Sequence, residues 1–369
     1  MKVPFVDLKI QYLGIKDEIQ KEINEVLDNT SYICGKKTKK FEGGFSKIQN
    51  VKYCVGLSSG TDALHTALKA LDIKSGDEVI VPVNTFIATS ESVSLCGAKP
   101  VFVDNDERTF NIDVNKIENA ITGNTRAIIP VHLYGQPAEI DKIMEIAEKH
   151  DLVVIEDCSQ AHLSEYKGKK TGSFGNIGTF SFYPGKNMGA YGEAGAVITN
   201  DEKLYNKMLK FRQHGSLEKY IHECEGHNYR MEELQAGVLN VKLKHLNEWT
   251  EKRRKTASLY YKNLQNLSPE VVALPFVPDY IKHVYHLFVL RVKNRSELVK
   301  FLAEKEISTA LHYPIPLHLQ RAYDYLGYKK GDFPVAEKCC DEILSVPMYP
   351  EMTEEQVVYV CDAIKNFYD

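Results

Sequence analysis

The chain has 369 residues, of which 43% are apolar and 26% are charged, and its formal net charge is −4. A chain of this length can bury a large core and is expected to divide into a large and a smaller domain. Because it lacks the strongly basic balance that nucleic acid or an anionic membrane requires, neither is an expected partner.

Targeting and redox signals are weak. No segment approaches the roughly 18 consecutive apolar residues of a membrane helix, and the N-terminus MKVPFVDLKIQY lacks a signal-peptide pattern. The eight cysteines are scattered without a C-x-x-C pair, so we expect reduced thiols rather than a zinc ribbon or a disulfide framework. These features together predict a cytoplasmic protein.

Short β-branched runs alternate with helical patterns between about residues 50 and 200. The runs lie at 79–82, 100–104, 126–131 and 151–157, and a helical pattern over 140–150 separates the last two. This alternation predicts an α/β fold with a mostly parallel sheet between helices. Two further runs, at 178–182 and 195–199, have no helix between them, so part of the sheet is expected to be antiparallel.

The chain after residue 200 is mainly helical in pattern. Residues 233–266 predict one long connecting helix. Beyond it, a strand-like run at 284–292, a helix near 296–305 and a terminal helix suit a smaller α+β domain. We therefore expect a large domain at 1–245 and a small C-terminal domain at 246–369.

The stretch SFYPGKNMGAYGEAGA, residues 181–196, holds Lys186 between a proline-glycine turn and a run of small residues. Most lysines are solvated surface charges. Here Pro184 and Gly185 are expected to aim the side chain inward, and desolvation then lowers the pKa of the amine. A neutral amine is a nucleophile, so the pattern favours a chemical role.

The segment VIEDCSQAH ends a predicted buried strand with Asp157, and Gln160 and His162 follow at once. In open α/β sheets, ligands bind outside the carboxyl ends of the strands, so this acid lies where a cofactor is expected. The alternative is an ordinary helix cap or turn, for which aspartate is also suited.

A second ligand site is predicted by SSGTDALHTAL, residues 58–68, in which a turn of small residues opens a helix. The free N–H groups of the first helical turn and the helix dipole favour an anion such as phosphate. A well-capped helix without a ligand is the alternative, since serine, threonine and aspartate all favour that position.

Other cofactors fit less well. YPGKN lacks the spacing of a phosphate-binding Walker loop, and no G-x-G-x-x-G pattern follows a strand. The cluster HECEGH, residues 222–227, matches no catalytic zinc spacing, so no metal site is expected. A lysine, an acid after a strand and a phosphate turn are together what pyridoxal phosphate requires for its aldehyde, its ring nitrogen and its phosphate.

The order of SGTDAL, TFIAT, VIEDCSQAH, SFYPGKN and GHNYRMEELQA resembles the sugar aminotransferases of the DegT/DnrJ/EryC1/StrS family, a branch of the fold-type I pyridoxal phosphate enzymes. The similarity extends from VPFVDL near the start to SVPMYP near the end. It implies that Lys186 forms the Schiff base and moves the proton at the substrate carbon. It also implies that Asp157 pairs with the ring nitrogen.

The resemblance assigns further residues to the cofactor. Phe86 matches a position that stacks on the cofactor face, although a core helix residue is the alternative, and Gln160 matches a contact to the ring oxygen. The phosphate positions are Gly60, Thr61 and Ser181. Asn228 matches a residue that reaches the phosphate from the neighbouring subunit, which implies a homodimer with shared active sites. His162 is given only a supporting role for its loop.

The family reaction implies glutamate as amino donor and a nucleotide-linked keto sugar as acceptor. YPGKNMGAYGEAGA, with VLNVKLKHLNEWTEKRR, resembles the branch that aminates C3 of dTDP-linked 3-keto-6-deoxyhexoses. Tyr183 is expected to border the sugar, Lys219 and Tyr220 to contact the diphosphate, and His312 and Tyr313 to close over the pocket.

Three alternatives stay open at this point. One is a C4 aminotransferase acting on a nucleotide-linked 4-keto sugar. Another is a noncatalytic sensor or scaffold that keeps the fold, since a fold alone does not establish a function. The third, a nicotinamide-dependent oxidoreductase, is disfavoured because the dinucleotide glycine pattern is missing. A sugar dehydratase of this family replaces the lysine by histidine, whereas this chain has Lys186.

Overall fold

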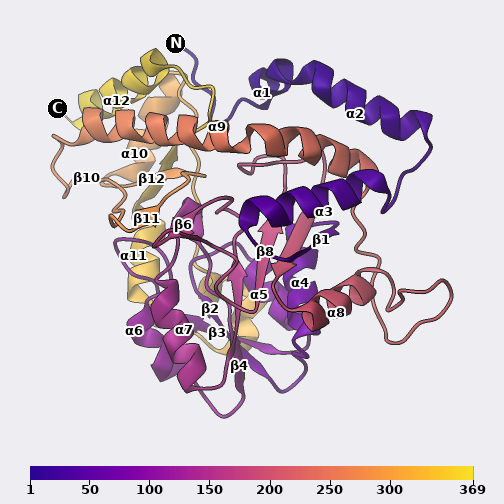
Figure 1. Ribbon diagram of the computed structural model, residues 1–369. Coiled ribbons are helices and arrows are strands. Elements are labelled where there is room, and N and C mark those ends of the chain that lie inside the picture. The colour runs from indigo at the N-terminus through magenta and orange to yellow at the C-terminus, as the bar shows by residue number, and fades with distance from the viewer. Residues whose placement is uncertain (369) are drawn as a thin grey trace.

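The core of the fold is a mixed seven-stranded sheet in a computed structural model that describes residues 1–368 (Figure 1). In sheet order the strands are β1 (Tyr53–Leu57), β9 (Gly195–Thr199), β8 (Ile177–Ser181), β5 (Val153–Asp157), β4 (Thr125–Ile128), β2 (Glu78–Pro82) and β3 (Lys99–Val103). Strands β3 to β8 pair in parallel, whereas β9 is antiparallel to both β8 and β1. The predicted mixed, mostly parallel sheet is confirmed.

Both faces of this sheet are covered, because alternate residues of each strand point to opposite sides. Val79 and Val81 of β2 join one core, to which α4 (Gly60–Ala70), α5 (Ala88–Leu95) and α8 (Glu202–Arg212) contribute. Ile80 between them joins the opposite core, with α6 (Val114–Ile117) and α7 (Ile140–Lys149). Burial on both faces explains why these strands are continuous apolar runs rather than alternating ones.

A long helix, α9 (Glu233–Leu264), connects the sheet to the C-terminal part of the chain. Figure 1 shows it running across the top of the molecule, from beside α3 (Lys36–Gln49) to beside α12 (Glu354–Tyr368). The N-terminal helices α1 (Leu8–Gly14) and α2 (Lys16–Asp28) lie along its first half, where Ile19 packs against Val238 and Val241. The predicted single connecting helix is therefore present with nearly the expected bounds.

The C-terminal part has its own core around a three-stranded sheet. Its strands are β10 (Val272–Ala273), β12 (Phe288–Val292) and β13 (Ile343–Val346), and its helices are α10 (Arg295–Glu304), α11 (Pro334–Glu342) and α12. The second half of α9 supplies Tyr260 and Leu264 to this core, and the N-terminus supplies Val3. The expected boundary at 245/246 lies inside α9 and stays a prediction.

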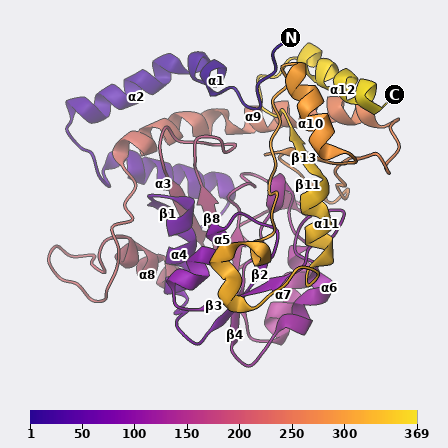
Figure 2. The ribbon, with the colours of Figure 1, turned by 180° about the vertical axis from the view of Figure 1, so that it is seen from behind.

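One segment returns from the C-terminal part to the large sheet. Leu317, Tyr323 and Phe333 pack into the same core as α4 and α5, and Figure 2 shows this orange segment beside α5. The 3₁₀ helices of the chain are η1 (Glu118–Ala120), η2 (Leu133–Gly135), η3 (Leu317–Leu319) and η4 (Arg321–Leu326). A small sheet also joins the two parts, with strands β11 (Ile281–Lys282), β6 (Glu165–Tyr166) and β7 (Lys169–Lys170).

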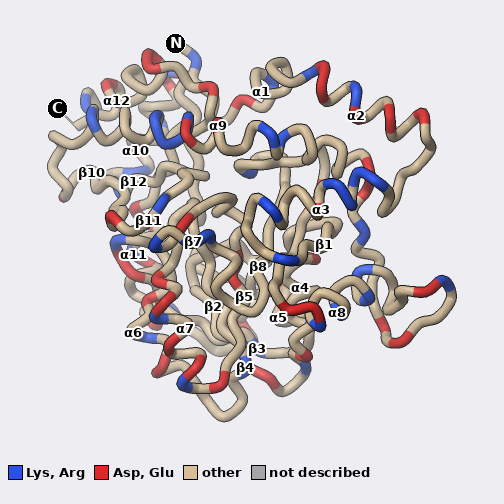
Figure 3. The backbone as a smooth tube through the Cα atoms, in the orientation of Figure 1, with Lys and Arg blue, Asp and Glu red and all other residues tan. Residues whose placement is uncertain are grey.

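Charges of both signs are spread over the periphery, whereas the central strands are largely free of them (Figure 3). This distribution agrees with the small net charge of the sequence and with burial of both faces of the sheet. Over residues 1–368, none of the helices combines the length and the apolar character needed to cross a lipid bilayer.

Candidate active site

A cavity of about 700 Å³ lies where the carboxyl ends of β5 and β8 meet the start of α4. It brings together most residues that the sequence predicted, although they are spread over more than 250 positions of the chain. Those that line it are Gly60, Thr61, Phe86, Asp157, Gln160, Ser181, Tyr183, Lys186, His312 and Tyr313. The last two come from the C-terminal part, so both parts of the chain form the walls.

Asp157 is the last residue of β5, and its side chain is only 4% exposed. One carboxylate oxygen accepts a hydrogen bond from the backbone N–H of Ser159 at 3.0 Å, and the other from the Thr89 hydroxyl at 2.9 Å. These two donors fix the orientation of the carboxylate toward the cavity. Thr89 was not singled out from the sequence, although it ends the quoted motif TFIAT.

Lys186 follows the predicted turn, in which its backbone N–H donates to the carbonyl of Tyr183 at 2.8 Å. Burial lowers the pKa of its ammonium group to about 8, and the negative charge of Asp157 opposes this shift. The small residues behind the turn serve close packing, since a Cβ atom at Gly189 would lie 2.2 Å from the carbonyl oxygen of Pro184. The turn thus presents an amine with a substantial neutral fraction near pH 8.

A candidate anion site lies where α4 begins against the end of β8. The Ser59 hydroxyl caps the helix by accepting from the N–H of Asp62 at 3.0 Å, while Gly60 and Thr61 line the cavity at the first turn. A Cβ atom at Gly60 would lie 2.5 Å from Cβ of Ser181, so only glycine allows this approach. First-turn N–H groups with a nearby hydroxyl suit a phosphate group.

The amide of Gln160 and the aromatic rings of Phe86 and Tyr313 form another wall of the cavity. The Gln160 amide accepts from the N–H of Tyr134 at 2.7 Å and donates to the Tyr313 hydroxyl at 3.1 Å. The rings of Phe86 and Tyr313 lie 5.8 Å apart. Phe86 is 53% exposed, so the alternative that it is a core residue is wrong. Its ring is available to a planar ligand.

Two predicted histidines differ in their position. His312 lines the cavity, hydrogen-bonds through Nδ1 to the Ser345 hydroxyl at 2.8 Å, and has its pKa lowered to about 4 by burial. His162 is fully buried behind the cavity wall and packs between Phe180 and Phe182. Its pKa is lowered to about 3, mainly by burial, which agrees with a supporting role rather than a chemical one.

Three predicted residues do not reach the cavity of their own chain. Lys219, Tyr220 and Asn228 lie in the segment between α8 and α9, which projects from the body of the molecule (Figure 1). Tyr220 is 82% exposed, and the Lys219 ammonium group lies 5.0 Å from the centre of its ring. Asn228 makes a backbone bridge with Gln213.

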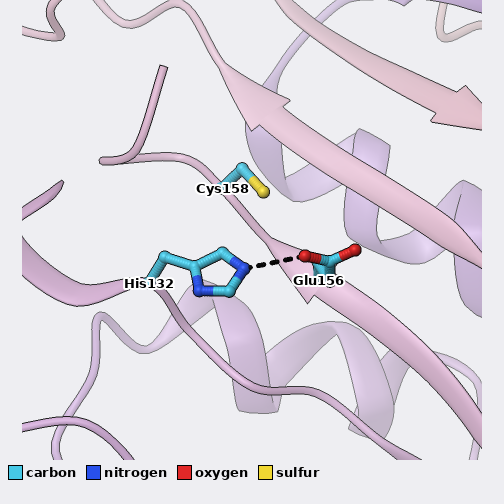
Figure 4. Close-up of side chains that lie close together, drawn as sticks. All are labelled: His132, Glu156 and Cys158. Atoms are coloured by element: carbon cyan, nitrogen blue, oxygen red, sulfur yellow. Dashed lines mark hydrogen bonds and ion pairs between the residues drawn. The ribbon is translucent and has the colours of Figure 1, made fainter. Parts of the chain in front are cut away.

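A buried group of potential metal ligands, His132, Glu156 and Cys158, lies beside the end of β5 (Figure 4). His132 accepts through Nδ1 from the N–H of Ala138 at 3.0 Å, so Nε2 carries the proton and donates to Glu156 at 3.0 Å. Glu156 also accepts from backbone N–H groups at positions 172, 174 and 175, at 2.8, 2.7 and 2.8 Å. With these atoms engaged, the group is a structural network that anchors the strand carrying Asp157.

Sequence reasoning missed several residues of the cavity wall. They include Phe5 and Val6 from the N-terminus, Glu193 after the lysine turn, Arg253 from α9, His286 before β12 and Met348 after β13. Arg253 is 4% exposed, and its Nη1 donates to the carbonyls of Tyr285, His286 and Met348 at 3.2, 3.3 and 2.9 Å. Phe5, Val6, Glu193 and Met348 lie in stretches quoted above but were given no role there. No local pattern marks Arg253 and His286, because packing of α9 on the C-terminal sheet brings them to the cavity.

The arrangement fits one class of cofactor. Lys186 offers an amine, Asp157 a buried carboxylate, and the start of α4 an anion site, all on one cavity. Pyridoxal phosphate supplies an aldehyde that takes up an amine and a protonated ring that withdraws electrons from the reacting carbon. The fold and site thus define a pyridoxal phosphate-dependent enzyme of the fold-type I class.

Comparison with known proteins gives the family. Residues 14–365 match the DegT/DnrJ/EryC1/StrS aminotransferase family, and the chain belongs to it. The pleiotropic regulatory protein of Geobacillus stearothermophilus is 47% identical over 100% of this chain and 99% of that protein. The dTDP-3-amino-3,6-dideoxy-alpha-D-galactopyranose transaminase of Aneurinibacillus thermoaerophilus is 44% identical over 99% of both chains.

The chain is also similar to a relative named for another nucleotide sugar and to proteins of solved structure. The UDP-N-acetyl-3-dehydro-alpha-D-glucosamine 3-aminotransferase of Acidithiobacillus ferrooxidans is 43% identical, over 99% of this chain and 97% of that protein. The structure of S. venezuelae DesV has a TM-score of 0.97 and 40% identity, over 100% and 99% of the two chains. NtdA of Bacillus subtilis, with bound cofactor PMP, has a TM-score of 0.91 and 33% identity, over 99% and 85%. The chain is a pyridoxal phosphate-dependent sugar-nucleotide aminotransferase.

Proposed function

We propose that this enzyme transfers the amino group of glutamate to the C3 keto group of a dTDP-linked 3-keto-6-deoxyhexose, for the synthesis of aminodeoxysugars. The observation that carries the proposal is the joint presence of Lys186, Asp157 and the start of α4 on one cavity. A volume of about 700 Å³ suits the alternate entry of a small amino acid and a larger nucleotide sugar.

Each group in the cavity has a proposed role. Lys186 would hold the cofactor through its amine and would move the proton at the reacting carbon, a role to which a pKa of about 8 is suited. Asp157 keeps the ring nitrogen protonated. Gly60, Thr61 and Ser181 hold the phosphate, while Phe86 and Gln160 contact the ring.

The C3 position and the nucleotide rest on the relatives. Two of them, at 44% and 43% identity, have names that refer to position 3: one names a dTDP-linked 3-amino sugar, and the other a UDP-linked 3-dehydro sugar and a 3-aminotransferase. The two names share the sugar position, C3, and differ in the nucleotide. Amination at C3 is therefore better supported than the choice of dTDP. Amination at C4 is the alternative, and the dTDP moiety is proposed on relatives whose names carry it, such as the transaminase of Aneurinibacillus thermoaerophilus.

A homodimer with shared active sites is the proposed functional unit. Lys219, Tyr220 and Asn228 all lie in the exposed segment between α8 and α9 and do not line the cavity of their own chain, which is expected of residues that serve a neighbouring copy. In that assembly Asn228 contacts the phosphate of the cofactor, while Lys219 and Tyr220 contact the diphosphate of the substrate. Tyr183, His312 and Tyr313, from the chain's own cavity wall, complete the sugar site. The cytoplasmic location stays a prediction from the sequence.

A noncatalytic sensor is a second candidate, because one relative is named a pleiotropic regulatory protein. The oriented carboxylate of Asp157 and the lowered pKa of the Lys186 amine favour the enzyme, since a scaffold needs neither. The name of a relative does not decide between these functions.

Incubation with glutamate and dTDP-3-keto-6-deoxyhexoses of gluco and galacto configuration tests the proposal. We expect a dTDP-3-amino-3,6-dideoxyhexose, with nitrogen on C3 by magnetic resonance, and no product from the Lys186→Ala variant. The 4-keto isomers are incubated in parallel, and nitrogen on C4 of their product would contradict the C3 assignment. Failure of every sugar nucleotide, with normal cofactor binding, would favour the sensor.

A further inference from the structure

His286 lines the cavity from the segment that precedes β12, one hundred residues after the lysine turn. Its Nδ1 lies 3.1 Å from Oδ1 of Asn187, the residue directly after Lys186. Asn187 is 3% exposed, and its side-chain NH₂ donates to the carbonyl of Val284 at 3.1 Å. The asparagine therefore ties the lysine turn to the histidine segment.

These contacts determine which nitrogen of His286 carries the proton. Because the NH₂ group of Asn187 is directed to a carbonyl, its other side-chain atom is an oxygen, which only accepts hydrogen bonds. Nδ1 of His286 must then be the donor. In a neutral imidazole, Nε2 is consequently an unprotonated acceptor.

The imidazole is neutral because of its surroundings. Burial, followed by the positive charges of Lys186 and Arg253, lowers the pKa of His286 well below its ordinary value. A base this weak is unsuited to removing a proton, but its lone pair still accepts a hydrogen bond. None of the side-chain hydrogen bonds within residues 1–368 involves Nε2 of His286, and the residue lines the cavity.

We propose that Nε2 of His286 accepts a hydrogen bond from a ring hydroxyl next to the keto carbon of the nucleotide sugar. This inference rests on the proposed function, because the reacting carbon must then lie beside Lys186. Phosphate, carboxylate and keto oxygens cannot donate to a lone pair, whereas a sugar hydroxyl can. His286 is thus a specificity-determining residue for the hydroxylated sugar ring.

Two substitutions of His286 test the roles of its two ring nitrogens separately. The His286→Asn variant places its amide where Nδ1 stands, so it keeps the contact to Asn187 and loses the acceptor in the cavity. The His286→Gln variant places its amide near Nε2, so it keeps the acceptor and loses the contact to Asn187. Each variant is the matched control of the other, and circular dichroism with thermal unfolding checks that both holoenzymes fold.

Calorimetry measures how tightly each holoenzyme binds two compounds. One is dTDP-6-deoxygalactose, which has ring hydroxyls and no keto group, and the other is dTDP alone. One neutral hydrogen bond predicts that His286→Asn binds the sugar nucleotide about three- to tenfold more weakly, with the affinity for dTDP unchanged. His286→Gln should stay within about twofold of the wild type for both compounds.

The outcomes distinguish the two proposals. If the wild type binds the sugar nucleotide and His286→Asn binds it equally well, the role of His286 is overturned and the proposed function stands. If both variants weaken dTDP and the sugar nucleotide alike, His286 has only a structural role and the inference is again overturned. If the wild type does not bind the sugar nucleotide, the proposed acceptor fails and this inference fails with it.

Discussion

At the scale of single residues, Lys186 and Asp157 set the protonation state of the site through opposite effects. Burial favours the neutral amine of Lys186, whereas the charge of Asp157 favours the ammonium form. Burial is the larger effect, so the pKa falls to about 8. Capture of an aldehyde cofactor requires the neutral amine, so its rate should follow this titration.

The pH dependence of cofactor capture is therefore predictable. We expect the rate at which cofactor-free protein takes up pyridoxal phosphate to rise with pH and to level off above about 8. In the Asp157→Asn variant the midpoint should move to lower pH, because the charge that raises the pKa is removed. Stopped-flow absorbance measures both, and a midpoint near the ordinary value of 10.5 would contradict the account.

The sequence could predict the residues that lie in local motifs, such as Lys186 and Asp157, because their neighbours in the chain carry the signal. His286 and Arg253 could not be predicted this way. Their role depends on contacts to residues far away in the sequence, and their own neighbours resemble ordinary strand and helix residues. Packing alone brings them to the cavity.

At the scale of elements, the proposed phosphate site lies where α4 meets β8. Gly60 lets the start of α4 approach Ser181. Gly195 lets β9 pass close to Ser59, since a Cβ atom at Gly195 would lie 2.1 Å from the Ser59 carbonyl oxygen. Both approaches need residues without side chains. The order of strands and helices could be predicted from the alternation of strand-like and helical patterns in the sequence. These two close approaches could not.

The Gly60→Ala variant tests this contact. Its Cβ atom would clash with Ser181, so α4 should move away and the affinity for pyridoxal phosphate should fall at least about tenfold, with a loss of about 1–3 kcal/mol in unfolding free energy. Gly43→Ala, in helix α3, is the control, because nothing lies within 4 Å of its Cβ position. The control should be neutral or more stable by up to about 1 kcal/mol. Equal cofactor affinity in both variants would argue against the proposed cradle.

At the scale of the whole molecule, the chain's own cavity contains only part of the predicted site. The motif GHNYRMEELQA predicted Asn228, and the structure places this residue in the projecting segment between α8 and α9. A sequence cannot say which copy of a chain its residues serve. It also did not predict that residues 317–336 return to the large core, since an apolar pattern does not specify its partner.

Mixing two inactive variants tests the shared site. In a heterodimer of Lys186→Ala and Asn228→Asp, one site receives both substitutions and the other receives neither. We expect subunit exchange to restore about a quarter of wild-type activity, because half of the randomly mixed dimers are heterodimers with one intact site. If Asn228 serves its own chain, each site keeps one lesion and no activity returns. Activity against mixing ratio distinguishes the two cases.

The covalent attachment of the cofactor to Lys186 is the claim on which the whole account depends. Borohydride reduction of the purified holoenzyme, followed by digestion and mass spectrometry, locates the attachment directly. The account predicts a pyridoxyl group on the peptide that contains SFYPGKN, at Lys186, and loss of this label in the Lys186→Ala variant. A label on another lysine, or a holoenzyme that binds the cofactor without any reducible link, would contradict it.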